Sequence, residues 1–305
     1  RQDSFWSSEE LVDWSVPTLA VKTLRQIGAT DTDNAKTLTP TELAQEYTQN
    51  DGWWQIDSTY RQYIDATQSA TVPYPREAAV KQRVTDHYMS FLQEINRPLA
   101  NELSDDPSLG LSQTDFYEEF ADPKKGTAII ICDGLRYELA EIIKKNLERS
   151  TDFEQSIDAM SAAVPSVTEV GMAAHLPGTL GLSVEDNDLV VTSGGEVMSK
   201  KSDRVERFND AGFDVVTMDD VNSISITELS ETDPVPRVVY SATIDKLGES
   251  LDDDAAFSRV ASHIDDVERT VQRLKQAGYT RFVITSDHGF LYTDRLSDEL
   301  KVESP

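Results

Sequence analysis

The sequence has few of the residues from which disulfides, histidine-rich metal sites and membrane spans are built. Its 305 residues include a single cysteine, Cys132, which excludes a disulfide within the chain, and only four histidines. No apolar run approaches the roughly 18 residues of a membrane-spanning helix, and no signal-peptide pattern is present. We therefore expect a cytoplasmic protein without a membrane partner.

Basic residues are also scarce, because 28 Lys and Arg stand against 55 Asp and Glu, which gives a formal net charge of −27. High charge with low hydrophobicity is typical of disorder, but here the apolar residues follow regular strand and helix patterns. Such an acidic surface is typical of a protein from a very salty cytoplasm, where ions screen the self-repulsion. We predict a halophilic source, and the charge argues against a broad nucleic-acid-binding surface at ordinary salt.

The strongest apolar pattern lies in TAIIICDGLRY, residues 127–137. Its unbroken run from Ala128 to Cys132 predicts a strand buried on both faces, and the helical spacing after it predicts a strand–turn–helix unit. In open α/β sheets, ligands bind beyond the carboxyl ends of such strands, where Asp133 would lie. Asp133 could instead only cap the following helix.

A second strand, predicted at residues 280–286, leads directly into Asp287 and His288. Asp133, Asp287 and His288 can then meet at one edge of the sheet, although 154 positions separate the two aspartates. Two carboxylates and an imidazole suit Zn²⁺ or Mn²⁺. The other histidines are weaker candidates: His87, His175 and His263.

Residues 164–178, VPSVTEVGMAAHLPG, predict a hydroxyl-rich turn and a short helix that Pro177 stops. Thr168 would lie in the first turn of this helix and Ser166 before it. The free N–H groups and dipole of a helix start favour an anionic oxygen, so Thr168 beside a cation could act as a nucleophile. An ordinary N-cap is the alternative role for Thr168.

Four motifs in order, IIICDGLRY, PSVTEVGMAAHLPG, YSATIDKLGES and VITSDHGFLY, resemble the PglZ domain of the alkaline-phosphatase superfamily. The resemblance covers residues 125–293. It implies an α/β fold with an alkaline-phosphatase-like, mainly parallel sheet and helices on both faces. It also implies that Asp133, Asp287 and His288 bind a divalent metal and that Thr168 is the nucleophile.

The resemblance further implies a second metal site, to which Asp245 and Glu249 of DKLGE would contribute. Glu249 stands where the superfamily often has histidine, and the 17 residues after His288 contain no other histidine. We therefore expect one complete site for zinc or manganese. The sequence does not decide whether the second site is complete.

Residues 1–122 predict an all-helical N-terminal region, with a helix from Glu9 to Ile27 that Pro17 kinks or splits and a helix start at Thr39 and Glu42. Breaker-rich residues before Gly126 place a boundary there, so that residues 123–305 form the catalytic domain. This domain includes a strand at 152–160 and a long helix at 252–277. A start at Arg1 and an end just past a core motif indicate a fragment, with the catalytic domain truncated at its C-terminus.

Residues 179–240 are interpreted as an inserted cap subdomain, with a strand at 188–191, a helix at 202–211 and a strand at 213–217. The insert contains a basic cluster that includes Lys200, Lys201 and Arg204. The cluster is either a solvated helix face or a contact with substrate phosphate, since insertions beside a shared core often determine substrate choice. Arg136, three residues after Asp133, is a further candidate phosphate contact.

The predicted function is that of a metal-dependent phosphodiesterase or phosphatase. The resemblance implies a role in antiviral defence of the BREX type, a phosphodiester in a nucleotide or nucleic acid as substrate, and other defence proteins as partners. The alternative is a catalytically weak assembly subunit of a multi-protein defence complex, which the incomplete second site and the acidic charge favour.

Overall fold

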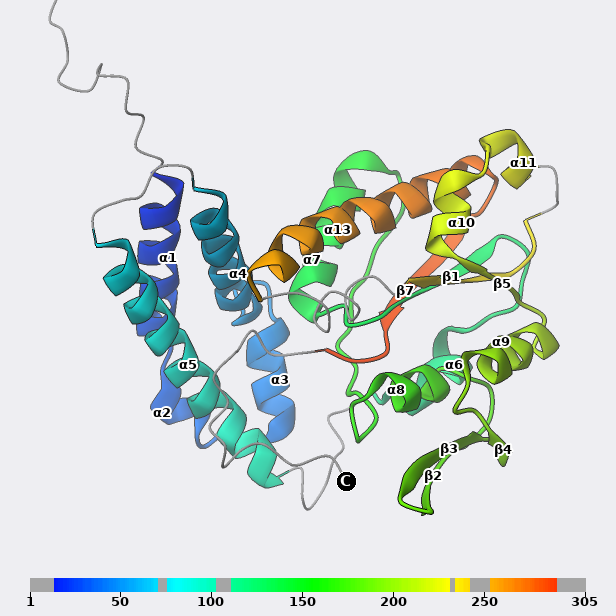
Figure 1. The fold of residues 1–305 in the computed structure, drawn as a ribbon, viewed down its shortest axis with the longest axis horizontal. Helices are drawn as coiled ribbons and strands as arrows, with labels where there is room; N and C mark the ends of the chain where they lie inside the picture. The colour runs from blue at the N-terminus through cyan, green and yellow to red at the C-terminus, as the bar shows by residue number, and fades with distance from the viewer. Residues whose placement is uncertain (1–13, 71–75, 103–110, 231–233, 242–252, 290–305) are drawn as a thin grey trace, which may run out of the picture. The chain divides into compact units, whose positions relative to one another are not determined.

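The computed structural model describes residues 14–70, 76–102, 111–230, 234–241 and 253–289 (Figure 1). The chain falls into two compact units, Arg1–Asp106 and Pro107–Pro305. In the part of the chain that the structure describes, no helix has the length and apolarity needed to cross a membrane.

The first unit is helical, as predicted. Its described helices are α1 (Ser15–Ala29), α2 (Thr32–Ala35), α3 (Pro40–Thr48), α4 (Trp54–Ser69) and α5 (Glu77–Glu102). Pro17 lies in the first turn of α1, where a missing N–H costs no intrahelical bond, so it does not split the helix. The capping box of Thr39 and Glu42 at the start of α3 is confirmed.

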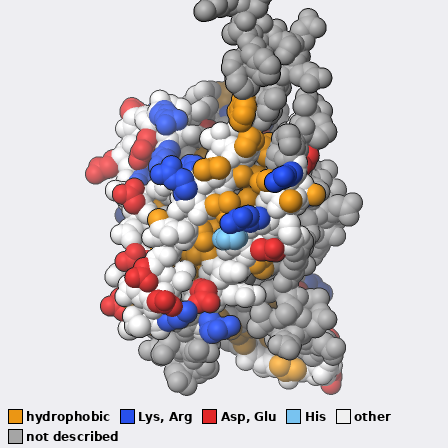
Figure 2. All heavy atoms as spheres, turned by 90° about the vertical axis from the view of Figure 1, so that its left-hand side faces the viewer, with side chains coloured by type: hydrophobic (Ala, Val, Ile, Leu, Met, Phe, Trp, Pro, Cys, Tyr) orange, Lys and Arg blue, Asp and Glu red, His pale blue; other side chains and the backbone are white. Residues whose placement is uncertain are grey.

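The helical unit has a core that combines aromatic rings with one buried carboxylate. Asp57 is buried and accepts hydrogen bonds from the hydroxyls of Tyr47 (2.7 Å) and Tyr88 (2.8 Å). The face of the molecule shown in Figure 2 is mixed, with apolar side chains gathered in its middle among charged ones. Exposed apolar residues of this unit include Trp14 and Val21.

The second unit is built on a four-stranded parallel sheet of order β5-β6-β1-β7 (Figure 1). Its strands are β5 (Asp214–Thr217), β6 (Arg237–Ser241), β1 (Thr127–Cys132) and β7 (Arg281–Ser286). Cys132, the last residue of β1, is paired with Ser241 of β6 and Ser286 of β7. The residues that follow these three strands therefore emerge side by side.

Helices cover both faces of this sheet, as the apolar run of β1 predicts. Ala128, Ile130 and Cys132 pack with helices of one face: α7 (Tyr137–Ser150), α10 (Met218–Ser223), α11 (Ile226–Ser230) and α13 (Asp253–Gln276). Ile129 and Ile131 pack with those of the other face: α6 (Phe116–Phe120), α8 (Thr168–Ala174) and α9 (Lys201–Asp210). The mixed α/β fold with a helical N-terminal region is therefore confirmed.

The segment between α8 and β6 contains a small antiparallel sheet, β2 (Leu180–Glu185), β3 (Asp188–Ser193) and β4 (Glu196–Val197). The predicted strand near 213–217 is not part of an insertion, because β5 pairs with β6 as an edge of the main sheet. The predicted strand at 152–160 is wrong: this segment forms no ladder. Its Phe153 instead packs its ring against Phe282.

Candidate metal and nucleophile site

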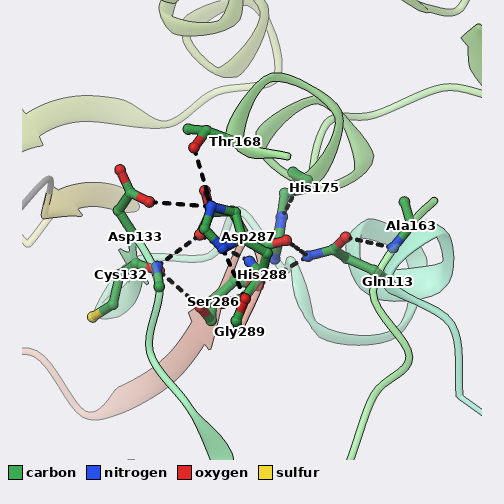
Figure 3. Close-up of polar contacts among 12 residues, drawn as sticks. Gln113, Cys132, Asp133, Ala163, Thr168, His175, Ser286, Asp287, His288 and Gly289 are labelled. Atoms are coloured by element: carbon green, nitrogen blue, oxygen red, sulfur yellow. Dashed lines mark hydrogen bonds and ion pairs between the residues drawn. The ribbon is translucent and has the colours of Figure 1, made fainter. Parts of the chain in front are cut away.

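The side chains of Asp133, Asp287 and His288 converge at the carboxyl edge of the sheet (Figure 3). Asp133 follows β1, and Asp287 and His288 follow the neighbouring strand β7. One ligand atom from each of the three residues lies within 4.8 Å of the others. Nε2 of His288 is 3.6 Å from Oδ1 of Asp133 and 3.6 Å from Oδ2 of Asp287. The three predicted ligands therefore share one small volume.

The carboxylate of Asp287 is held in a fixed orientation by backbone groups. Its Oδ1 accepts hydrogen bonds from the N–H groups of Gly134 (3.0 Å) and His288 (2.9 Å). Gly134 has a φ of 73°, a left-handed conformation that favours glycine in the turn after β1. Burial raises the pKa of Asp287, and the nearby His288 and these N–H groups offset part of that effect.

The other oxygen of Asp287 supports a cation at this position. Oδ2 is buried and has no hydrogen-bond donor among the residues that the structure describes. A buried carboxylate oxygen without a donor is costly, and a metal ion would compensate for that cost. Two carboxylates and an imidazole are also ligands that Zn²⁺ and Mn²⁺ accept. The geometry therefore fits a divalent metal.

His288 presents the correct nitrogen for metal binding. Its Nδ1 lies 3.2 Å from the carbonyl oxygen of Gly289. A carbonyl can only accept, so Nδ1 donates to it, and Nε2, the nitrogen beside the two carboxylates, is the one that a metal would take. This is the common arrangement of a metal-binding imidazole, in which the second ring nitrogen donates to the backbone.

Thr168 also reaches this site. It is the first residue of α8, and its Oγ1 lies 3.1 Å from Nε2 of His288. Val167, not Thr168, is the N-cap, so the alternative role as an ordinary cap does not hold. Ser166 is exposed and precedes the helix. The structure thus separates the two hydroxyls, and in the part of the chain that it describes only that of Thr168 contacts His288.

Arg136, a candidate phosphate contact, lies beside the loop that carries His288. It is buried at the N-cap of α7. Its Cγ lies 4.0 Å from the position that a Cβ atom of residue 289 would take, so it flanks the loop that carries His288. The candidates for the second metal site, Asp245 and Glu249, lie outside the described residues.

The basic cluster of the predicted insertion divides into two kinds of side chain. Lys200 and Lys201 are exposed at the start of α9. Arg204 is buried, and its Nη1 donates to the carbonyl oxygens of Met198 (2.8 Å) and Ser199 (3.0 Å). These bonds tie Arg204 to the entry of α9, and its contact with substrate phosphate stays a prediction.

Two residues beside the site were not predicted to contribute. Gln113 lies in the short helix η1 (Gln113–Asp115), before the first strand, and its buried amide reaches the backbone of Asp287. His175 is buried at the end of α8 and lies 3.0 Å from the hydroxyl of Thr285. No local pattern marks Gln113, whereas the histidine of MAAHLPG was visible but lacked an identifiable partner.

Fold and site together define an α/β domain in which an Asp–Asp–His cluster that fits a divalent metal lies with a hydroxyl at the carboxyl edge of a parallel sheet. Residues 116–303 match the model of the PglZ family, described as the BREX system PglZ alkaline phosphatase-like domain. The chain belongs to this family.

Two curated relatives extend this result. The chain is 27% identical over 210 residues to the alkaline phosphatase-like protein PglZ of Bacillus cereus (strain H3081.97), across 64% of this chain and 24% of the relative. It is 25% identical over 205 residues to the alkaline phosphatase-like protein BrxZ of Escherichia coli O9:H4 (strain HS), across 59% of this chain and 22% of the relative. The chain therefore matches about a quarter of the length of each relative.

Proposed function

We propose that this chain is a metal-dependent phosphoryl hydrolase, specifically a phosphodiesterase that acts on nucleotides or nucleic acid in antiviral defence. The observation that carries the proposal is the convergence of Asp133, Asp287, His288 and the hydroxyl of Thr168 in one site. Membership of the PglZ family supports phosphoryl chemistry, and its BREX relatives support other defence proteins as partners.

In this proposal Thr168 is the nucleophile. Its oxygen bonds to phosphorus in line as the bond to the leaving oxygen breaks, and water then attacks the phosphothreonine and restores the hydroxyl. A divalent cation held by Asp133, Asp287 and His288 would polarise a phosphoryl oxygen and lower the pKa of a neighbouring hydroxyl. Arg136 would bind the non-bridging phosphate oxygens from beside the His288 loop, since a guanidinium matches their geometry.

Lys200 and Lys201 are proposed as further contacts for substrate phosphate. Both are exposed at the start of α9, and α9 leads into the edge strand β5 of the main sheet. Because a crossover helix runs antiparallel to the strand that it precedes, its start lies toward the carboxyl edge of that sheet, where the metal ligands are.

The test is the hydrolysis of bis(p-nitrophenyl) phosphate by the purified chain in roughly molar KCl, a concentration that screens the acidic surface. Treatment with EDTA should abolish turnover, and added Zn²⁺ or Mn²⁺ should restore it. Asp133→Asn should lower kcat/KM by on the order of a hundredfold, as expected for loss of a metal ligand. Asp188→Asn is the matched control, because Asp188 is exposed on β3 and should change nothing.

A second candidate function is an assembly subunit of a defence complex that has little catalytic activity. The formal net charge of −27 favours it, because such a surface repels nucleic acid at ordinary salt. A chain that binds the metal but hydrolyses no phosphodiester would support this alternative. Turnover that survives both EDTA and Asp133→Asn would contradict the metal-dependent proposal.

A further inference from the structure

The proposed chemistry depends on the separation between two pieces of chain, helix α8 with Thr168 and the turn after β7 with Asp287 and His288. The parallel sheet alone does not fix that separation. In the described sheet β7 is an edge strand that pairs only with β1, and α8 belongs to the layer that covers one face. Something outside the strand ladder must therefore hold the turn and the helix together.

Gln113 holds the turn from one side (Figure 3). Its Nε2 donates to the carbonyl oxygens of Ser286 (2.9 Å) and Asp287 (2.6 Å), and its Oε1 accepts from the N–H of Ala163 (3.0 Å). The side chain is 1% exposed, so these bonds are made away from water. A single amide thus links the backbone of a metal ligand to the segment that enters α8.

His175 ties the far end of α8 to the same strand (Figure 3). Its Nδ1 lies 2.7 Å from the carbonyl oxygen of Gly171, so that nitrogen carries the proton, and its Nε2 accepts from the hydroxyl of Thr285 at 3.0 Å. The imidazole is completely buried, and the ring of Phe116 lies against it at 4.5 Å. Burial lowers the pKa of His175 to about 4, which keeps the ring neutral.

Between these two ties, the backbone of α8 lies directly against that of the turn. A Cβ atom at Gly171 would lie 2.0 Å from the carbonyl oxygen of Asp287, so only glycine allows this approach. The Asp287 carbonyl is therefore enclosed between the amide of Gln113 and the surface of α8.

We propose that Gln113 and His175 are positioning residues, which set the distance between the nucleophile helix and the metal ligands Asp287 and His288. This inference rests on the proposed function for its catalytic consequence, but its effect on metal affinity is independent of turnover. Gln113 precedes the residues that match the PglZ family model, so the site draws on a segment outside that match.

The experiment uses the full chain and compares two replacements of one histidine. In His175→Gln the amide reaches the position of Nε2 and keeps the tie to Thr285. In His175→Asn the shorter amide reaches the position of Nδ1 and keeps only the bond to Gly171. For each variant we would measure the dissociation constant of Zn²⁺, kcat and KM for bis(p-nitrophenyl) phosphate, and the Tm without metal.

We expect His175→Asn to weaken Zn²⁺ binding roughly tenfold and to lower kcat with little change in KM, as for other residues that orient metal ligands. His175→Gln should keep the Zn²⁺ affinity and kcat close to those of the unmodified chain. Gln113→Met keeps the shape but removes all three hydrogen bonds, so it should weaken Zn²⁺ binding to a similar degree. Gln45→Glu, at an exposed position on α3, is the control and should leave the affinity unchanged.

Unchanged Zn²⁺ affinity and kcat in both His175→Asn and Gln113→Met, with only a lower Tm, would overturn the inference and reduce these residues to structural ones. If Gln113→Met fails to fold, the two His175 variants still test the inference. Equal Zn²⁺ affinity and equal kcat in His175→Gln and His175→Asn would contradict the tie to Thr285. If the unmodified chain binds Zn²⁺ but hydrolyses no substrate, that result would contradict the proposed function and leave the positioning role intact.

Discussion

The hydroxyl of Thr168 lies 3.1 Å from Nε2 of His288, although 120 residues separate them in the chain. The contact joins the first residue of α8, a helix whose residues 170–174 are buried, to the turn after β7, an edge strand of the described sheet. Because Nε2 also lies 3.6 Å from a carboxylate oxygen of Asp133 and of Asp287, the hydroxyl shares the site with the three side chains that we propose as metal ligands. This relationship supports the proposed role of Thr168 as the nucleophile.

Thr168→Ala should abolish most phosphodiester hydrolysis. We expect a loss on the order of a hundredfold or more in kcat, while the affinity for Zn²⁺ changes little, because the ligands stay in place. Ser166→Ala is the matched control, since Ser166 is exposed two residues earlier. Steady-state kinetics and metal titration of both variants check this. An active threonine variant with an inactive serine variant would reverse the assignment.

Gly171→Ala should destabilise the second unit. The added methyl would lie 2.0 Å from the carbonyl oxygen of Asp287, which cannot yield without moving the backbone of a ligand. We expect a cost of about 1–3 kcal/mol or more in the free energy of unfolding, together with weaker metal binding.

Gly28→Ala provides a control with the same chemical change. Gly28 also lies in a helix, α1, but a Cβ there meets nothing within 4 Å. Alanine favours helix more than glycine by up to about 1 kcal/mol, so this variant should be neutral or slightly more stable. Denaturant unfolding in roughly molar salt compares Gly171→Ala with Gly28→Ala. Equal changes in the free energy of unfolding would contradict the close approach of α8 to the turn.

The sequence predicts where Asp133 and Asp287 lie, because each directly follows a strand with a clear apolar pattern. Ala128 to Cys132 are all buried, and because their side chains alternate between the two faces, both faces of the sheet must be covered, as is observed. Asp133 and Asp287 then lie at the ends of adjacent strands. Their proximity follows from the topology, which the order of motifs indicated.

The remaining features depend on contacts that local pattern does not encode. Gln113 acts on carbonyls 173 and 174 positions away, so nothing in its own segment indicates the partner. The sequence around Arg204 likewise does not indicate that its Nη1 donates to the carbonyl oxygens of Met198 and Ser199. The place of β5 in the main sheet also depends on its pairing with β6, which the pattern of residues 213–217 does not indicate.

Stability should fall as the pH decreases below neutrality, in part through His263. This side chain is completely buried, and neither ring nitrogen has a hydrogen-bond partner among the described residues. Burial lowers the pKa of His263 from 6.5 to about 4. Between these values the unfolded chain binds a proton that the folded chain excludes, so the free energy of unfolding decreases as the pH falls from about 6.5 to about 4.

His263→Leu should remove the contribution of His263 to this pH dependence. It should also raise the free energy of unfolding at pH 7 by on the order of 1 kcal/mol, because two unsatisfied nitrogens are lost. His175, whose pKa is also lowered to about 4, should maintain part of the slope. His87→Leu is the control, since His87 is exposed on α5. Unfolding curves at pH 7 and 4.5 compare the variants, and an identical slope in His263→Leu would contradict this account.

Salt should stabilise the fold. The formal net charge of −27 causes self-repulsion that about molar salt screens almost completely, because the Debye length there is only about 3 Å. We expect the Tm to decrease steadily as KCl is diluted to roughly a tenth of that concentration. A Tm that is flat or higher in dilute salt would contradict the halophilic interpretation.

The most direct test of the central claim is anomalous diffraction at the zinc edge from crystals of this chain grown with Zn²⁺. We predict a peak at about 2.0–2.2 Å from an oxygen of Asp133, an oxygen of Asp287 and Nε2 of His288, the usual lengths of zinc–oxygen and zinc–nitrogen bonds. The hydroxyl of Thr168 should face the same ion. Zinc peaks that lie only at other positions, with these three side chains free of metal, would contradict the account.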